Sequence, residues 1–185
     1  MRLFTYLFCL ILLGSACKKV DPLGYRMYTI KEGNHRSTYQ YTTNFDTLVR
    51  FKAIFDSSAI YNTTDPSNQY DVNKLYGVSD CGCSHMKYSI RFGWRWLNDS
   101  LEILLFKHQG GVFSFEKITS ITLNDVHQYE IIKTDNEYVL YVDNVYRTTP
   151  RSCPGLYRSY FLYPYFGGDE TAPHNITIQI KKQNQ

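Results

Sequence analysis

The stretch from residue 88 to residue 96 combines aromatic and cationic side chains in a pattern that suits sugar chemistry. Large apolar residues alternate with polar ones along it, which is the period of a β-strand. One face of this strand carries Trp94 and Trp96, and the opposite face carries Arg91 and Arg95. Exposed aromatic rings can stack on sugar rings, and an arginine can neutralise the carboxylate of a uronate. These are residue types that a glycan-binding surface or a polysaccharide lyase uses.

A lyase also needs a base, which a histidine or a tyrosine can supply. His85 and His174 are available for this role. The simpler interpretation is that Arg91 and Arg95 lie on the solvated face of a half-buried strand, which is the commoner arrangement. No residue is therefore assigned a catalytic role.

Burial competes with binding for the aromatic residues as well. A continuous apolar face, such as the one that carries both tryptophans, is more often core than binding surface. Tyrosines recur along residues 156–165, and we expect these to be partly exposed, with Tyr165 as a further candidate ring. The candidate ligand-binding residues are Trp94, Trp96, Tyr157, Tyr160, Tyr163, Arg91 and Arg95.

The cysteines indicate an oxidising compartment. Three of the five cysteines lie beyond the N-terminal region, namely Cys81, Cys83 and Cys153, and they allow one disulfide and one remaining thiol. A bridge between Cys81 and Cys83 would be strained, so we expect Cys153 to pair with one of the two. The alternative is a zinc site built from Cys81, Cys83 and His85, although no fourth ligand occurs at a standard spacing.

The N-terminus has the features of an export signal. Arg2 precedes the apolar residues 3–13, a run shorter than the ~20 residues that cross a bilayer. Small residues then lead to Cys17, as a processing site requires. This boundary resembles the lipobox of bacterial lipoproteins, here Leu13-Gly14-Ser15-Ala16-Cys17. The resemblance implies that the signal peptide, residues 1–16, is removed and that Cys17 carries lipid.

A lipid on Cys17 implies a membrane address. Residues 17–26 then form a lipidated tether, because their Lys, Asp, Pro and Gly residues offer no periodic apolar face. We expect export and attachment to the outer membrane, on its periplasmic side or at the cell surface. The basic pair Lys18-Lys19 favours the periplasmic side.

Residues 27–185 have the length of a single domain. The formal net charge of the chain is +3 and no dense basic block occurs, which disfavours nucleic acid as a partner. The 17 tyrosines suit an extracytoplasmic β-protein, since tyrosine favours strands and wet interfaces.

Strand-like alternation recurs through this domain, and no segment outside the signal has the apolar period of a helix. The turn residues Asn98-Asp99-Ser100 predict a hairpin that joins residues 88–96 to residues 101–106. Further strands are expected near residues 49–55, 112–115, 129–133, 138–142, 156–165 and 176–181. Many short strands separated by turns predict an all-β fold, either two packed antiparallel sheets or a barrel.

A resemblance helps to choose between these two folds. The paired strands of concanavalin A-like jelly rolls are similar to His127-Gln128-Tyr129-Glu130-Ile131-Ile132 and Tyr138-Val139-Leu140-Tyr141-Val142-Asp143-Asn144. This superfamily of lectins, laminin-G modules and glucanases implies an antiparallel two-sheet β-sandwich, and the similarity covers about residues 125–149. The segment 163–174 also resembles lipoproteins of the Bacteroidota.

The resemblance brings expectations about chemistry. Glucanases of the superfamily carry acids as Glu-x-Asp-x-Glu on one strand, because hydrolysis needs paired carboxylates at the scissile bond. No such motif occurs, and the adjacent Asp169 and Glu170 would point to opposite sides of an extended segment. Lectins of the superfamily often use calcium, for which Asp169, Glu170 and Asp80 are candidate ligands. No other cofactor is indicated.

Three functions remain, and each predicts a different surface. The preferred one is a non-catalytic module that binds glycan through stacking aromatic rings in a solvent-facing groove. A carbohydrate-active enzyme, either a polysaccharide lyase or a glycoside hydrolase, would place facing carboxylates or an Arg–His–Tyr cluster in that groove. A structural envelope lipoprotein with a protein partner would expose an apolar patch without a groove.

Overall fold

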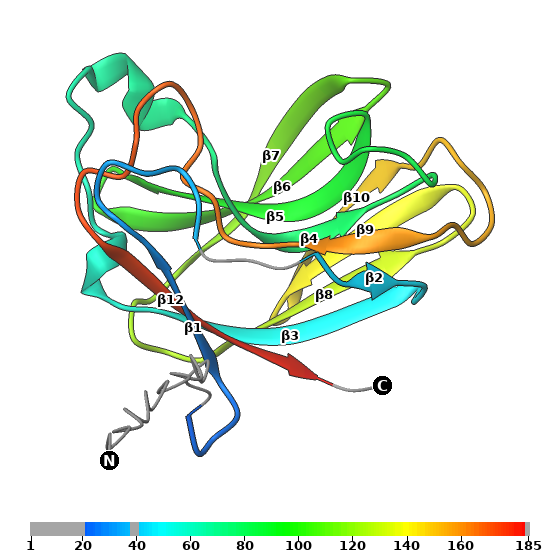
Figure 1. The fold of residues 1–185 in the computed structure, drawn as a ribbon, viewed down its shortest axis with the longest axis horizontal. Helices are drawn as coiled ribbons and strands as arrows, with labels where there is room; N and C mark the ends of the chain where they lie inside the picture. Colours follow the sequence, from blue (N-terminus) through cyan, green and yellow to red (C-terminus); the bar gives the residue numbers. More distant parts are fainter. Residues whose placement is uncertain (1–20, 38–40, 184–185) are drawn as a thin grey trace, which may run out of the picture.

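The computed structural model describes residues 21–37 and 41–183, which form two antiparallel sheets packed face to face (Figure 1). The strands of sheet I, in spatial order, are β1 (Arg26–Ile30), β12 (Ile176–Gln183), β3 (Leu48–Phe55), β8 (His127–Lys133), β9 (Glu137–Val142) and β10 (Val145–Pro150). Those of sheet II are β2 (Thr43–Asn44), β11 (Ser159–Leu162), β4 (Asn73–Ser79), β5 (Tyr88–Leu97), β6 (Ser100–Gln109) and β7 (Val112–Ile121). The 3-10 helices η1 (Ser57–Ala59) and η2 (Pro66–Tyr70) connect β3 to β4. The predicted all-β sandwich is confirmed.

Alternate residues of both sheets fill the space between them. Phe51 of β3 stacks on Tyr129 of β8 with ring centroids 4.8 Å apart, and Phe92 of β5 meets Tyr129 edge-on at 5.0 Å. These three fully buried rings join sheet I to sheet II. Because Phe92 points into this core, Arg91 and the other residues of β5 that are out of phase with it point to the outer face of sheet II.

The N-terminal end of the described chain packs on the domain. Asp21 Oδ1 accepts a hydrogen bond from the Tyr25 backbone N–H at 2.8 Å, and the Tyr25 side chain is buried. Within the predicted tether, a turn and a buried ring therefore attach residues 21–26 to the sandwich. Cys17 and the predicted signal peptide lie outside the described residues. In the described ranges, no helix has the length and apolar character needed to cross a membrane.

Strand β4 was not predicted, because a bulge interrupts its alternation. Its register with β5 shifts between Lys74 and Gly77, so the adjacent residues Leu75 and Tyr76 are both buried. An inserted residue breaks the period of two on which sequence patterns depend. At Gly77 a Cβ would lie only 2.4 Å from the Cα of Arg91, so glycine is needed for β4 to lie this close to β5.

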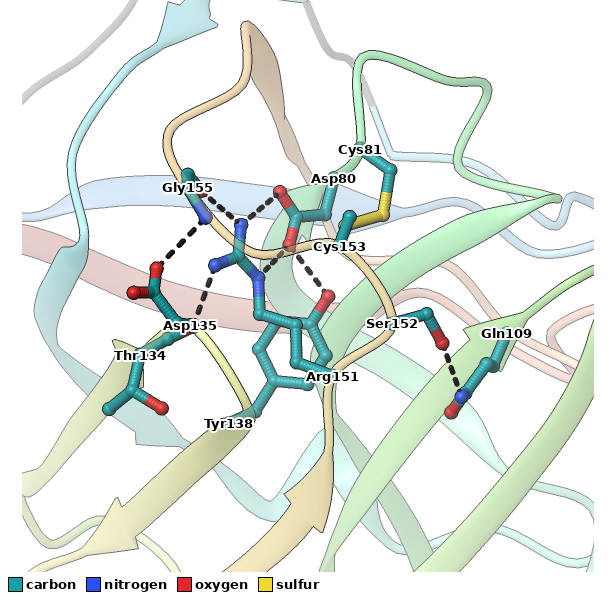
Figure 2. Close-up of a disulfide and its surroundings, with 10 residues drawn as sticks. All are labelled: Asp80, Cys81, Gln109, Thr134, Asp135, Tyr138, Arg151, Ser152, Cys153 and Gly155. Atoms are coloured by element: carbon teal, nitrogen blue, oxygen red, sulfur yellow. Dashed lines mark hydrogen bonds and ion pairs between the residues drawn. A yellow bond between two sulfur atoms is a disulfide. The ribbon is translucent and has the colours of Figure 1, made fainter.

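A buried ion pair joins the two sheets at one end (Figure 2). Arg151, just after β10 of sheet I, donates from Nε to Asp80 Oδ2 at 2.7 Å, and Asp80 directly follows β4 of sheet II. The Tyr138 hydroxyl of β9 donates to the same oxygen at 2.6 Å. The two charged side chains are only 2% and 0% exposed. Burial alone would raise the pKa of Asp80, but hydrogen bonds from Arg151 and Tyr138 outweigh it and hold that pKa below its usual value.

The disulfide lies beside this ion pair and closes the same junction. It joins Cys81 to Cys153, which is one of the two pairings that were predicted, and Cys83 is a free thiol. The alternative zinc site of Cys81, Cys83 and His85 is wrong, because the sulfur of Cys81 is already bonded to Cys153.

We expect Asp80→Asn to lower the free energy of unfolding by about 3 kcal/mol or more, since the change leaves the Arg151 charge buried without a counter-charge. Urea unfolding at pH 7 measures the difference. Glu116→Gln is the matched control, because it breaks the exposed pair with Arg147 and should cost less than about 1 kcal/mol. Equal losses in the two variants would contradict a structural role for the buried pair.

Candidate functional site

A groove of about 700 Å³ lies on the outer face of sheet II. Outward-facing residues of β4, β5, β6 and β7 form its floor, and its walls come from the segment after η2, the loop before β5 and residues 165–169. The side chains in it that can carry positive charge are Arg36, Lys74, His85, Arg91 and His108, and its carboxylates are Asp71 and Asp169. A smaller hollow of about 90 Å³ adjoins it, and Arg36, His85 and Arg91 line both.

Arg91 is the centre of this site. It lies in the middle of β5, paired with Gly77 of β4 on one side and with Phe106 of β6 on the other. Its side chain is 7% exposed and donates from Nη2 to the Tyr163 carbonyl at 2.8 Å, while Nε has no hydrogen-bond partner. Among the described residues no carboxylate forms an ion pair with it.

The missing counter-charge at Arg91 has a cost. Burial lowers the pKa of the guanidinium, yet an arginine keeps its charge in a protein. A charge taken out of water without a partner is unfavourable. Arg91 therefore offers an uncompensated positive charge to an anion that enters the groove.

Neighbouring groups respond to this concentration of positive charge. Burial, and then repulsion from Arg91, lower the pKa of Lys74 to about 8, although Asp71 partly opposes the shift. Burial and repulsion from Arg91, Lys74 and His85 lower the pKa of His108 to about 4, so its imidazole is neutral at pH 7. An anion bound at Arg91 would offset the positive charge that repels these two groups, and this electrostatic gain favours binding.

His85 occupies the opposite end of the groove from β7. Its backbone N–H donates to the Tyr160 hydroxyl at 2.8 Å, and its Nδ1 lies 3.0 Å from the same oxygen. Burial, and then the charges of Arg91 and Arg36, lower its pKa. Tyr163 lines the smaller hollow beside it, as do Tyr41 and Tyr165. Arg91, His85 and Tyr160 thus form an Arg–His–Tyr cluster beside the smaller hollow.

The predicted binding residues divide into several groups. Trp94 is wrong as a ligand-binding residue, because its ring is 0% exposed and packs in the core against Phe55. Arg95 lies on the outer face as predicted, but its Nε donates to Glu102 at 2.7 Å, so its charge is already neutralised. Trp96 lines a separate hollow with Tyr70, which also borders the groove.

Of the remaining predicted residues, some lie at the groove and others do not. Arg91 lines the groove, and Tyr160 lies at its His85 end. Tyr163 is wrong as an exposed binding ring, because its side chain is buried in the core and stacks on Tyr28, and its carbonyl accepts the hydrogen bond from Arg91. Tyr157 lines neither the groove nor the smaller hollow beside it, and it is partly exposed. His174 lies elsewhere, with its Nε2 2.9 Å from the Ser58 carbonyl.

The predicted calcium ligands, Asp169, Glu170 and Asp80, have different roles in the structure. Glu170 accepts hydrogen bonds from the backbone N–H groups of Thr64 and Asp65, both at 2.8 Å, and these contacts hold its pKa at about 2. Its carboxylate therefore fastens the loop before η2. Asp169 faces the groove, and Asp80 is held by Arg151. In the described part of the chain, the group of three metal-ligating side chains is Asp80, Cys81 and Cys153, whose two sulfurs are joined in the disulfide, and neither Asp169 nor Glu170 belongs to it.

The strands beneath the groove lack the Glu-x-Asp-x-Glu motif of the superfamily's glucanases, and the two carboxylates that line the groove, Asp71 and Asp169, lie outside the strands. The carboxylate on the outer face of β6 is Glu102, and it accepts from Arg95 and from Lys117, each at 2.7 Å. Burial raises its pKa, but these two cations outweigh burial and keep it ionised. An acid held in this way cannot donate the proton that hydrolysis requires.

Comparison with known proteins places the architecture. No protein-family model matches the sequence, and no curated protein matches it either. The structure of alginate lyase AlyC3 is similar with a TM-score of 0.59 and 11% identity, over 89% of this chain and 76% of that one. A glycoside hydrolase family 16 enzyme from a mixed-linkage glucan locus of Bacteroides ovatus gives 0.54 and 7% identity, over 86% and 81% of the two chains. The catalytic domain of a laminarinase from Thermotoga petrophila gives 0.54 and 12%, over 86% and 75%.

The fold is the concanavalin A-like jelly roll. The resemblance seen in the sequence of β8 and β9 is thereby confirmed for the architecture. In this jelly roll the groove lies across the strands of sheet II, with Arg91 at the middle of its floor.

Several groove residues were missed by sequence reasoning. The predicted strand over residues 101–106 stops short of His108, whereas β6 continues through it to Gln109. Lys74 lies on the bulged strand β4, whose pattern gave no signal. Phe113 and Phe115 alternate with Ser114, a signal that could have been used, but an apolar face of that kind is usually core.

We expect the imidazole of His108 to titrate at about pH 4 in NMR spectra of the protein. Arg91→Met should raise that pKa part of the way toward its ordinary value, because one repulsive charge is removed while burial remains. Arg147→Met, which removes an exposed arginine from sheet I, is the control and should leave it unchanged. A His108 pKa insensitive to Arg91 would contradict the electrostatic description of the site.

Proposed function

We propose that the groove on sheet II binds an acidic glycan, with the carboxylate of a uronate sugar on Arg91. The observation that carries this proposal is the buried Arg91 guanidinium, which lines the groove and has no carboxylate partner among the described residues. A carboxylate accepts paired N–H donors from arginine and is the anion that such a fork recognises best. Lys74 and Arg36 line the same groove and add to the attraction.

The structural comparisons support a carbohydrate ligand. The similar proteins include an alginate lyase and enzymes described as acting on glucans, and all place their chemistry on this type of β-sandwich. Alginate is a polymer of uronates, which matches the charge of the groove, whereas glucans are neutral. Polyuronates are therefore the ligands to test first.

The main proposal is binding without chemistry, and one observation favours a second function. His85 and Tyr160 are hydrogen bonded at 3.0 Å, and His85 lines the hollow that contains Arg91. A lyase uses a cation to neutralise the uronate carboxylate and a neutral histidine or tyrosine to remove the proton next to it. Both lowered pKa and position suit His85 to that role.

We also propose that the protein is an exported lipoprotein, anchored to the outer membrane through lipid on Cys17. The support is the sequence of residues 1–17, with its short apolar run and its lipobox-like boundary. An anchored domain whose groove faces away from the cytoplasm would meet extracellular or periplasmic polysaccharide.

We expect the protein to bind a mannuronate hexasaccharide, and Arg91→Met to weaken this binding by about 30-fold or more, as when one partner of a buried charge pair is removed. Isothermal calorimetry measures the affinity. Arg147→Met should bind like the unaltered protein, because its charge lies on sheet I. Urea unfolding provides a further control, since removing a buried unpaired charge should leave Arg91→Met at least as stable.

Incubating the protein with the mannuronate hexasaccharide also distinguishes binding from cleavage. An unsaturated product, detected by its ultraviolet absorbance and lost in His85→Ala, would favour the lyase. Unchanged oligosaccharide would favour the binding module. Failure of the protein to bind any acidic oligosaccharide would contradict both.

We expect metabolic labelling with a radioactive fatty acid to label the full chain in a bacterial host, and Cys17→Ser to abolish the label and release the protein from the membrane fraction. Cys83→Ser is the matched control and should retain both, because Cys83 lies within the folded domain. Labelling that persists in Cys17→Ser would contradict lipidation at this residue.

A further inference from the structure

The outer face of β6 and β7 carries a second feature that the charges do not explain. The rings of Phe106, Phe113 and Phe115 lie nearly parallel, with interplanar angles of 10° and 7° between successive rings and centroids 5.9 and 6.5 Å apart. Phe106 is buried beneath, but Phe113 and Phe115 are 58% and 45% exposed. Exposing two neighbouring aromatic rings is unfavourable, and such a surface marks a binding site.

These rings lie at the groove, outside the core between the two sheets. All three line it together with Arg91, and the buried core cluster between the sheets does not include them. The Nζ of Lys74 lies 4.7 Å from the centroid of the Phe106 ring, so a cation borders the aromatic surface. We call Phe106, Phe113 and Phe115 the aromatic shelf.

Strand register determines how the shelf is placed relative to Arg91. Arg91 pairs with Phe106 of β6, and Phe106 pairs with Phe115 of β7. The three residues therefore form one row perpendicular to the strands. Neighbouring strands are about 4.8 Å apart, so Arg91 and Phe115 are separated by about 10 Å at the backbone. That span exceeds one sugar ring and requires a chain of them.

We propose that Phe113 and Phe115 stack on the sugar rings that follow the uronate held by Arg91 in the direction of β7, so that a glycan chain lies across β5, β6 and β7 and binds more tightly as it lengthens. The inference rests on the proposed function of the groove. The axial C–H groups of a pyranose form an apolar face that packs on an aromatic ring, which removes both surfaces from water. The mixed character of the row, a cation followed by rings, matches a sugar that carries an acid and an apolar face.

Affinity as a function of chain length tests this arrangement. The unaltered protein should bind a mannuronate hexasaccharide at least tenfold more tightly than mannuronate alone. The double variant Phe113→Ala/Phe115→Ala should bind the hexasaccharide more weakly, by about fivefold for each ring removed. That factor is what burying a modest apolar area contributes to affinity. Its affinity for the monosaccharide should not change, since that ligand reaches only Arg91. Tyr146→Ala, which removes an exposed aromatic ring from sheet I, is the matched control.

The outcomes separate this inference from the proposed function. A double variant that binds the hexasaccharide like the unaltered protein, while Arg91→Met does not, would overturn the shelf and leave the acidic-glycan site intact. Binding of neutral laminarihexaose that depends on the two phenylalanines but not on Arg91 would support the shelf and overturn the acidic ligand. A dimer of the unaltered protein that the double variant dissociates, seen by analytical ultracentrifugation, would assign the shelf to a second copy of the chain and overturn the inference.

Discussion

The buried pair of Asp80 and Arg151 is the interaction on which both the sandwich and the groove depend. It joins the end of β4 in sheet II to the chain that leaves β10 in sheet I, and the disulfide Cys81–Cys153 lies beside it (Figure 2). Asp80 also begins the loop that leads into β5, with its backbone N–H bonded to the Tyr88 carbonyl at 3.0 Å. That loop carries His85 to the groove. The same contacts that close the fold therefore position one wall of the site.

Two buried arginines, Arg151 and Arg91, differ in whether their charge is paired. Arg151 donates to both carboxylate oxygens of Asp80 and to the carbonyls of Thr134 and Gly155, so its charge and its donors are satisfied. Arg91 donates only to the Tyr163 carbonyl, and its Nε is unpartnered among the described residues. A paired buried charge holds a structure together, whereas an unpaired one lowers stability and persists where a ligand supplies the counter-charge.

Much of the fold could be predicted because the core of each long strand follows a period of two. In β5 that period placed Arg91 on the outer face correctly, and it also placed Trp94 opposite, where the structure buries it. The site was harder to predict because it depends on register between strands. Lys74 lies on the bulged strand β4, and His108 lies on β6 beyond the end of the strand that the sequence predicted. Neither position can be read from the spacing of residues along the chain.

The aromatic shelf marks the limit of the same reasoning. Alternation at Phe113 and Phe115 identifies a strand, but it does not say which face is covered, and in the first half of β7 the apolar face is the exposed one. Register then aligns Arg91, Phe106 and Phe115 in one row. A bare anion would not need the rings, and a purely apolar molecule would leave the charge unpaired. The row is therefore best satisfied by a ligand that carries both an acid and an apolar face within one extended chain, as an acidic polysaccharide does.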